Sequence, residues 1–429
     1  MKKQLLLIVF FIGFFNTINA QNDNLEKLLF NLPDVIFKKI ETAQGFESAY
    51  ELKVKQPIDH SDLSKGYFYQ KAYLTHSGFD KPTVIITEGY SRNRNRVYEL
   101  TQLLNANQID VEHRFFGESM PDSLNYNYLN LKQASADLHH IKQLFSTIYL
   151  KKWVSTGISK GGSTTVFYRY FYPNDVDVSV PYVAPINNAF EDQRIYKFLN
   201  TTGTDDCRKK IKSFQIRLLK NRDKILPLLK FYSMGAGAKY TYLTLAQAFE
   251  YTVLEYPFSF WQYGQDCDKI PNNKASIEDI VTYLTSVSDI TFFGDDLIKN
   301  YGSHYYQAAA EMGYYGYQTK EFKNLLKALP TSTNPHATFM PNKMTAKFDG
   351  TLLKNVNEWI KADAHKMIYI NGALDTWSAT AVPPNKNVDS EWFFLSGKHH
   401  GTARIANMTA SEKEKLIVTL EKWLSIKID

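Results

Sequence analysis

Short apolar runs, rich in β-branched and aromatic residues, recur along the first 186 residues and predict strands. These runs are Ala49–Lys55, Tyr67–Thr75, Thr83–Thr87, Ile109–His113, Trp153–Thr156 and Val178–Val183. Between the later runs, apolar residues recur at helical spacing over Lys132–Tyr149 and Gly161–Phe171. Strands that first follow one another as hairpin-like neighbours and then alternate with helices predict a mostly parallel sheet.

The pattern changes after Pro185, because residues from about 187 to 345 favour helices. The predicted helices are Arg208–Tyr232, Tyr240–Val253, Ile277–Ser286, Tyr305–Gly313 and Lys320–Leu329. Strands return at Met367–Ile370 and Trp392–Leu395, and an amphipathic helix follows at Ser411–Leu424. We therefore predict an α/β core in two parts, residues 21–186 and 351–429, with a helical cap of residues 187–350 inserted between them.

The N-terminal segment has the three-part layout of a secretory signal peptide. Lys2 and Lys3 precede an apolar run from Leu5 to Phe15, and small and polar residues then lead to Ala20. The run is shorter than the ~20 residues that a membrane span needs. We predict that residues 1–20 are removed, that the mature chain has no membrane span, and that it acts outside the cell or in a periplasm.

Composition excludes several classes of protein. The 429 residues are 22% charged and 44% hydrophobic, which excludes a disordered chain. The formal charge of +6 falls to +4 once Lys2 and Lys3 are removed, and so mild an excess argues against a nucleic-acid binder. The chain contains two cysteines, Cys207 and Cys267, and no Cys-x-x-Cys pair. In an oxidising compartment we expect a Cys207–Cys267 disulfide; the alternative is two free buried thiols.

The segment Gly157-Ile158-Ser159-Lys160-Gly161 matches the Gly-x-Ser-x-Gly pattern of a nucleophile elbow. It lies directly between a predicted strand and a predicted helix, which is the setting that the elbow requires. Flanking small residues let the strand and the helix approach closely, and the N-terminus of the helix favours developing negative charge. The sequence therefore predicts that Ser159 is a nucleophile.

A nucleophilic serine needs a base, and the base needs an orienting carboxylate. In α/β-hydrolases these groups follow in the order Ser, Asp or Glu, His. Asp375 follows the predicted strand at Met367–Ile370, and His399 and His400 follow the strand at Trp392–Leu395. Spacing alone leaves either histidine as the base. Adjacent histidines point in different directions, so a metal site at this pair is weak without further ligands. A serine mechanism needs no metal or cofactor, and we predict none.

An oxyanion hole is expected from two backbone N–H groups, one directly after the nucleophile and one in the loop after an early core strand. These would be the N–H groups of Lys160 and of Tyr90. Gly89 would allow the close approach of the loop. The neighbouring Glu88 is either a structural acceptor or a group that faces the substrate.

Several stretches together resemble the secreted tripeptidyl aminopeptidases first known from streptomycetes. They are Thr87–Tyr90, Val111–Gly117, Thr156–Gly162, Tyr182–Pro185, Asp206–Arg208, Pro257–Tyr263 and Asn371–Trp377. A more distant likeness is to lysosomal Pro-X carboxypeptidase and dipeptidyl peptidase II. The resemblance runs through nearly the whole mature chain. It implies an α/β-hydrolase core with a large helical cap inserted before the strand that carries the acid, and a serine exopeptidase that releases tripeptides from free N-termini through an acyl-enzyme.

In this resemblance, Ser159 matches the nucleophile of the family and Asp375 matches its acid. The tripeptidyl pattern ends in His-Gly, which matches His400-Gly401. The lysosomal relatives use the first of two adjacent histidines, which would be His399. We assign His400 as the base and keep His399 as the alternative.

An exopeptidase of this kind must bind the free ammonium of its peptide substrate, and carboxylates are the natural partners. Glu191 and Asp192, just after the last strand of the first core part, are the candidates; the alternative is that they are solvated loop charges. Other functions remain open on the same motif: a dipeptidyl or prolyl-type peptidase, an esterase or lipase, or an inactive binding protein.

Overall fold

The structure is a computed structural model that describes residues 24–330, 339–340 and 344–428. The predicted signal peptide, residues 1–20, lies outside the described residues. The chain divides into two compact units, and each is described by itself. Unit 1 comprises the described parts of Met1–Pro181, Lys366–Ile368 and Thr409–Asp429. Unit 2 comprises the described parts of Tyr182–His365 and Tyr369–Met408.

Within the described residues, nine strands form one mixed sheet in the order β1-β2-β3-β5-β4-β6-β7-β8-β9. Their bounds are Val35–Ile40 (β1), Ser48–Pro57 (β2), Tyr67–His76 (β3), Thr83–Thr87 (β4), Asn107–Val111 (β5), Trp153–Ile158 (β6), Val178–Tyr182 (β7), Ile368–Gly372 (β8) and Glu391–Leu395 (β9). The first three strands pair antiparallel, whereas β4 pairs in parallel with both β5 and β6. The predicted α/β core is therefore confirmed.

Strand β1 was not predicted, and its burial explains why. Its residues alternate between half-buried and exposed at the edge of the sheet, so it lacks a continuous apolar run. Every residue of β4, in contrast, is buried. A central strand with both faces covered is apolar throughout, and the predicted bounds of that strand match the structure.

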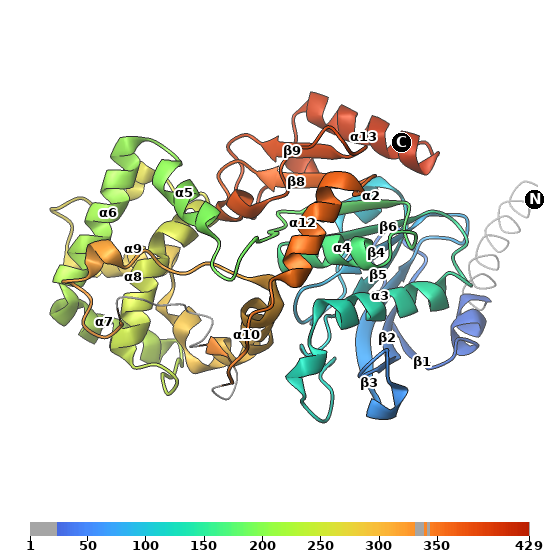
Figure 1. The fold of residues 1–429 in the computed structure, drawn as a ribbon, viewed down its shortest axis with the longest axis horizontal. Coiled ribbons are helices and arrows are strands. Elements are labelled where there is room, and N and C mark those ends of the chain that lie inside the picture. Colours follow the sequence, from blue (N-terminus) through green and yellow to red (C-terminus); the bar gives the residue numbers. More distant parts are fainter. Residues whose placement is uncertain (1–23, 331–338, 341–343, 429) are drawn as a thin grey trace, which may run out of the picture. The chain divides into compact units, whose positions relative to one another are not determined.

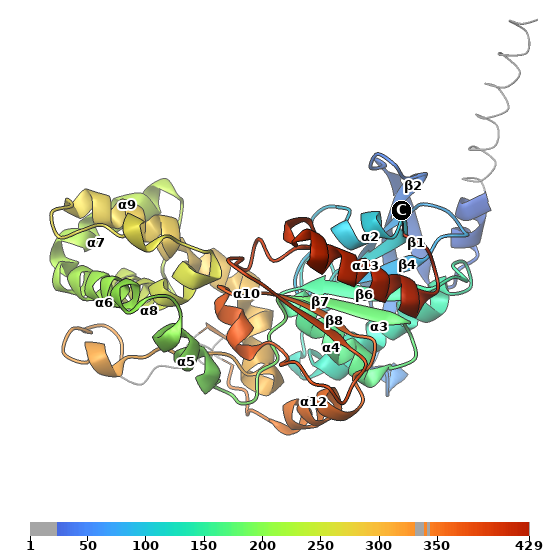
Figure 2. The same cartoon turned by 90° about the horizontal axis from the view of Figure 1, so that it is seen from above.

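Helices cover both faces of the sheet in unit 1. Figure 2 shows α13 (Ala410–Leu424) on one side of β6, and α3 (Leu131–Phe145) and α4 (Lys160–Phe171) on the other. A short helix, α2 (Glu99–Leu103), follows β4. Polar caps set where the longer helices begin: the side chain of Asn130 accepts from the Gln133 N–H, and Thr409 forms a capping box at the start of α13.

A fully buried ion pair supports the loop that follows β5. The Arg114 guanidinium donates from Nε and Nη2 to the two carboxylate oxygens of Asp137, at 2.7 and 2.6 Å. Its remaining donors bond to the backbone carbonyls of Pro57, Ile58 and Tyr128. Burial opposes the charge of Asp137, but Arg114 holds the pKa of that carboxyl below its usual value. Because every donor is used, the buried charge is tolerated and the loop is fixed.

The cap in unit 2 is helical, as predicted. Its helices are α5 (Gln193–Thr201), α6 (Asp205–Lys220), α7 (Arg222–Gly235), α8 (Leu245–Gln262), α9 (Ile277–Val287) and α10 (Asp295–Gln307), and α12 (Thr351–Ala362) precedes β8. Helices α6, α7, α8 and α9 lie side by side (Figures 1 and 2).

Three helix predictions have the wrong bounds. The helix predicted at Tyr305–Gly313 is the end of a longer one, because α10 already begins at Asp295 and runs to Gln307, and a π-helical turn follows at Ala308–Met312. The segment Arg208–Tyr232 is not one helix, because the chain leaves helical geometry at Asn221, whose side-chain amide donates to the Arg217 carbonyl. The helix predicted from Tyr240 begins only at Leu245, where Thr244 and Gln247 form a capping box. This helix, α8, also runs beyond Val253 to Gln262.

The helix predicted at Lys320–Leu329 is wrong. Only Lys320–Phe322 forms a short 3-10 turn. The backbone N–H groups of Lys327, Ala328 and Leu329 donate instead to the buried carboxylate of Glu250 on α8. A tertiary acceptor thus takes the donors that a helix would have used.

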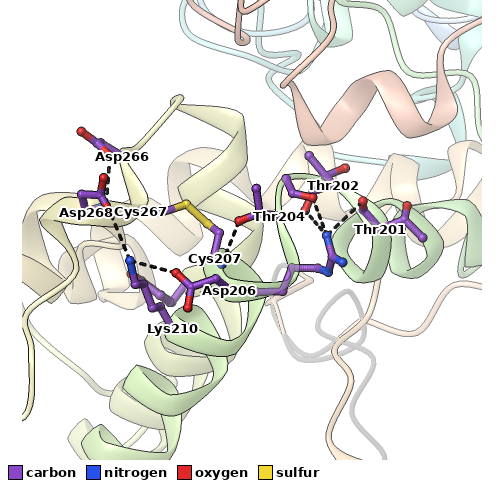
Figure 3. The surroundings of a disulfide bond; sticks show 12 residues. Thr201, Thr202, Thr204, Asp206, Cys207, Lys210, Asp266, Cys267 and Asp268 are labelled. Atoms are coloured by element: carbon purple, nitrogen blue, oxygen red, sulfur yellow. Dashed lines mark hydrogen bonds and ion pairs between the residues drawn. A yellow bond between two sulfur atoms is a disulfide. The ribbon is translucent and has the colours of Figure 1, made fainter.

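Cys207 and Cys267 form a disulfide within the cap (Figure 3). Cys207 lies in the first turn of α6, and its N–H donates to the capping hydroxyl of Thr204 at 3.1 Å. The ammonium of Lys210 bridges the carboxylates of Asp206 and Asp268, at 3.0 Å each, beside the bond. The disulfide joins positions 60 residues apart in the sequence, so it closes a large loop of the cap.

Replacing both cysteines by serine should lower the free energy of unfolding of the cap by roughly 4 kcal/mol, because the unfolded chain regains the freedom of that loop. Urea unfolding of oxidised wild type and of the double variant Cys207→Ser/Cys267→Ser measures the change. The control is Lys210→Ala, which removes only the exposed ion pairs and should shift the midpoint much less. Equal midpoints for wild type and the double variant would contradict the expectation.

Candidate active site

Ser159 lies at the sharp turn between β6 and α4, in an uncommon backbone conformation. Its φ of 60° and ψ of −125° belong to a region that residues with a side chain rarely adopt. Strain of this kind costs about 1–3 kcal/mol and persists only where the surroundings impose it. The Ser159 carbonyl accepts from the Ser163 N–H at 3.0 Å, so α4 starts directly at the strained residue. This is the geometry of a nucleophile elbow, and with the mixed sheet it identifies an α/β-hydrolase core.

The motif needs glycine at positions 157 and 161, because a side chain at either position would collide with neighbouring backbone atoms. A Cβ at Gly157 would lie 2.4 Å from the Gly161 carbonyl oxygen and 2.5 Å from that of Thr87. A Cβ at Gly161 would also lie 2.5 Å from the Thr87 oxygen. The Thr87 hydroxyl donates to the Gly161 carbonyl at 2.8 Å. The ends of β4 and β6 and the start of α4 are therefore in direct backbone contact.

The loop after β4 is attached to the elbow by the side chain of Lys160. This lysine is buried, and its ammonium donates to the Gly89 carbonyl at 2.7 Å. It also lies over the rings of Tyr90 and Phe116, at 5.4 and 4.9 Å from their centroids. A Cβ at Gly89 would lie 2.7 Å from the Lys160 Cβ. The sequence predicted a role for the Lys160 backbone only; the structure adds its side chain, which fixes the position of the Gly89–Tyr90 peptide.

Glu88 belongs to a buried charge network. Its carboxylate forms an ion pair with Arg92 and accepts from the Tyr98 hydroxyl. The same guanidinium lies 3.0 Å from Asp110, whose pKa burial raises to about 7 against the opposing charge of Arg92. The Arg92 N–H donates to Glu112 at 2.6 Å. This arrangement favours the structural interpretation of Glu88.

In unit 2 the structure brings Asp375 and His400 together. Asp375 follows β8 and is fully buried, and its Oδ2 lies 2.7 Å from His400 Nδ1. Its Oδ1 accepts from the Trp377 N–H at 3.1 Å. A carboxylate on Nδ1 fixes the tautomer of the imidazole and leaves Nε2 for proton transfer.

His399, the alternative base, has different partners. Its backbone N–H donates to the Thr402 hydroxyl, and its ring lies so close to Gly264 that a Cβ there would be 2.5 Å from the ring. Burial lowers the pKa of His399. Asp375 forms its hydrogen bond with His400, the histidine that the His-Gly pattern assigns as the base.

Two backbone carbonyls of the cap helix α8 hold the loops that carry Asp375 and His400, the proposed acid and base. The Thr376 hydroxyl donates to the Phe258 carbonyl at 2.8 Å, and the His400 N–H donates to the Gln262 carbonyl at 3.1 Å. Gln262 is the last residue of α8, where carbonyls have no partner within the helix. The cap helix is thus hydrogen-bonded to Thr376, next to Asp375, and to the backbone of His400. These two hydrogen bonds were not predicted from the sequence, because no local pattern shows that the Phe258 and Gln262 carbonyls accept from distant residues.

Glu191 and Asp192, the candidate substrate carboxylates, lie at the start of α5. Asp192 caps this helix, accepts from the N–H groups of Asn188 and Arg194 at 2.8 and 3.0 Å, and forms an ion pair with the Arg194 guanidinium at 2.7 Å. Burial opposes its charge, but hydrogen bonding to Arg194 lowers the pKa of Asp192. Glu191 accepts from the Tyr196 hydroxyl. Both carboxylates are engaged with the protein.

Neither a metal cluster nor a membrane-spanning helix is found in the part of the chain that the structure describes. Among the described residues, no three or more His, Cys, Asp or Glu side chains gather in a way that would hold a metal ion. No helix in the same part of the chain is long and apolar enough to cross a membrane.

The chain is similar to known peptidases along nearly its whole length. The profile of a family described as PS-10 peptidase S37 matches residues 21–427. The chain is 30% identical over 419 residues to prolyl tri/tetrapeptidyl aminopeptidase of Streptomyces mobaraensis, which covers 96% of this chain and 87% of the relative. It is 24% identical to prolyl carboxy peptidase like protein 5 of Caenorhabditis elegans, over 91% of this chain and 92% of the relative. It is 26% identical to human lysosomal Pro-X carboxypeptidase, over 33% of this chain and 32% of the relative.

A solved proline iminopeptidase from Mycobacterium smegmatis aligns over 87% of this chain and 97% of its own, with a TM-score of 0.38 and 11% identity. The predicted resemblance to tripeptidyl aminopeptidases is confirmed by the family match and by the streptomycete relative. The chain therefore belongs to the S37 family and is a serine peptidase.

Proposed function

We propose that this peptidase releases tripeptides from the free N-termini of peptides, through a triad of Ser159, Asp375 and His400. The observation that carries the proposal is the bond between Asp375 and His400 Nδ1, at 2.7 Å, in a chain whose serine has the strained backbone of an elbow. Each of the three residues follows the end of a strand, β6, β8 or β9. A related protein is named as a tri/tetrapeptidyl aminopeptidase, which supports the position of the cut.

In the proposed reaction, His400 Nε2 removes the proton from the Ser159 hydroxyl as its oxygen attacks the carbonyl carbon of the third residue. Asp375 stays ionised and stabilises the imidazolium that forms. The peptide C–N bond then breaks, and His400 gives its proton to the leaving amine. A water molecule, activated by the same histidine, hydrolyses the acyl-enzyme and releases the tripeptide as an acid.

The backbone N–H groups of Lys160 and Tyr90 would hold the oxyanion of each tetrahedral intermediate. The N-terminus of α4 adds favourable field at the same place. Lys160 acts here as a positioning residue as well, since its ammonium bonds to the Gly89 carbonyl and so fixes the peptide that carries the Tyr90 N–H. One such donor contributes about 3–4 kcal/mol to the stability of the transition state in comparable enzymes.

We further propose proline as the third residue of preferred substrates. The streptomycete relative is named as a prolyl enzyme. Beside Asp375, the rings of Phe258 and Tyr315 stack at 3.9 Å, and Trp377 meets Phe258 edge-on at 5.0 Å. The three side chains are largely buried, but Phe258 and Tyr315 both line a cavity, and a rigid aromatic wall suits the ring of proline better than a flexible side chain.

We also propose that residues 1–20 direct the protein out of the cytoplasm, where the Cys207–Cys267 bond persists. The helical cap, residues 187–350, would restrict the site to the ends of peptide chains. An esterase or lipase could use the same elbow, so substrates must decide between these functions.

Mass spectrometry of the products from a mixed peptide pool tests the proposed cut. We expect tripeptides from the N-terminus, predominantly with proline third, and no products from the same peptides after N-terminal acetylation. Dipeptide products, release of C-terminal residues, or equal cleavage of acetylated peptides would contradict the proposal. Faster turnover of short acyl esters than of tripeptide anilides would favour the esterase alternative.

Two alanine variants test which histidine is the base. His400→Ala should lower kcat for a tripeptide anilide by about 10⁶-fold, because the serine then has no proton acceptor. His399→Ala should stay within about tenfold of wild type, since it has no bond to Asp375. Circular dichroism of both variants establishes that they fold. The assignment is wrong if the loss falls on His399→Ala instead.

A further inference from the structure

Glu255 is a buried acid on α8 whose hydrogen-bond partners are all neutral. Its Oε2 accepts from the hydroxyls of Tyr315 and Tyr317, at 2.9 and 2.8 Å. Its Oε1 accepts from the Ser259 hydroxyl at 3.2 Å. Burial raises the pKa of Glu255 to about 7, although these three hydroxyls oppose the shift. Within the described part of the chain, no lysine or arginine forms an ion pair with it.

A second buried acid on the same helix shows what a purely structural carboxylate looks like in this cap. Glu250 forms an ion pair with Arg222 and accepts from three consecutive backbone N–H groups. Its charge is balanced by the protein. Glu255, one and a half turns further along α8, has hydroxyl donors but no cation, and a buried carboxylate in that state gains from a cationic ligand.

The position of Glu255 along α8 matches the length of the proposed product. The last residue of the helix, Gln262, supplies the carbonyl that holds the His400 N–H. Seven residues of α-helix separate Glu255 from Gln262, which is a rise of ~10 Å. Three extended residues of a peptide span ~10 Å, whereas two span ~7 Å. A peptide that places its third carbonyl at the acid and base loops would bring its N-terminus to the level of Glu255.

A third residue connects the two carboxylates. Tyr263 follows α8, and its pKa is raised by partial burial and by the charges of both Glu255 and Asp375. One phenol therefore lies within electrostatic reach of both groups. Tyr315 and Tyr317 also line a cavity of about 310 Å³, whose α8 wall is formed by Leu254, Pro257, Phe258 and Trp261. Two of the side chains that bond to Glu255 thus also line an open space, whose other walls carry Arg208, Lys209 and Lys212.

We propose that Glu255, held by Tyr315 and Tyr317, binds the N-terminal ammonium of the peptide substrate and so sets the length of the product. The inference rests on the proposed function and names a residue for it. The α-amino group of a peptide carries its charge near neutral pH, with a usual pKa of about 7.7–8.0, and it supplies the cation that Glu255 lacks. Glu191 and Asp192 are not needed for this role, because Tyr196 and Arg194 already engage them.

The test compares a tripeptide anilide with proline third, with its N-terminus free or acetylated, on wild type and on Glu255→Gln. Glutamine keeps the shape and an acceptor for the tyrosines but removes the charge. We expect kcat/KM for the free peptide to fall by about 100-fold, while kcat/KM for the acetylated peptide changes less than about threefold. The matched control is Glu278→Gln, which removes an exposed carboxylate in the first turn of α9 and should behave as wild type.

Labelling of Ser159 by a fluorophosphonate at the wild-type rate establishes that Glu255→Gln retains a folded, reactive site. If Glu255→Gln loses this labelling, the variant Tyr317→Phe is tested in its place, because it removes only one hydroxyl that bonds to Glu255. It should lower kcat/KM for the free peptide alone, by about five- to tenfold. The assignment of Glu255 would be overturned if Glu255→Gln lost kcat/KM equally on free and acetylated peptides. It would also be overturned if Glu255→Gln still preferred the free peptide as strongly as wild type does. If wild type itself cleaves both peptides equally, the proposed function fails, whatever the variant does.

Discussion

The candidate site depends on the absence of space around the Thr87 carbonyl. Gly157 and Gly161 both approach that oxygen so closely that no side chain fits at either position. The close approach lets β4, β6 and α4 meet, and the chain can then turn only through the strained backbone of Ser159. Gly89 continues the same contact, since its backbone lies against Lys160. The proposed nucleophile and both proposed oxyanion donors thus follow from one set of backbone contacts.

Helix α8 has the corresponding role in the other unit. Its last turn provides carbonyls to the residues beside Asp375 and to His400, and its middle carries Glu255. A single rigid element therefore connects the acid and base loops to the carboxylate proposed to bind the substrate's N-terminus. Because a helix has a fixed rise per residue, α8 sets the distance between these groups, and this distance is proposed to determine the length of the product.

The sequence predicted what local patterns encode. The Gly-x-Ser-x-Gly motif identified the elbow because strand, turn and helix are contiguous in the chain. Chain order and the His-Gly pattern led to Asp375 and His400, which the structure joins by a hydrogen bond. Central strands such as β4 were predicted within a residue or two because their apolar runs are continuous.

Features that depend on distant partners were missed. The side chain of Lys160 donates a hydrogen bond to the Gly89 carbonyl, 71 positions earlier in the chain, and no spacing rule predicts that contact. The helix expected after Lys320 is absent because Glu250 takes its N–H groups. Glu191 and Asp192 were predicted to bind substrate because of their position in the chain. In the structure both carboxylates accept hydrogen bonds from neighbouring residues at the start of α5. No local sequence pattern marks Glu255, and only its tyrosine partners, 60 and 62 positions along the chain, distinguish it.

The central claim is that Ser159 is a nucleophile activated by His400. Peptide mapping after reaction with a fluorophosphonate tests it most directly, because the adduct forms only on an activated serine. We predict a single adduct on Ser159 in wild type and in His399→Ala, and an adduct that forms at least ~10³-fold more slowly in folded His400→Ala. An adduct on another serine, or undiminished labelling of Ser159 in His400→Ala, would contradict the account.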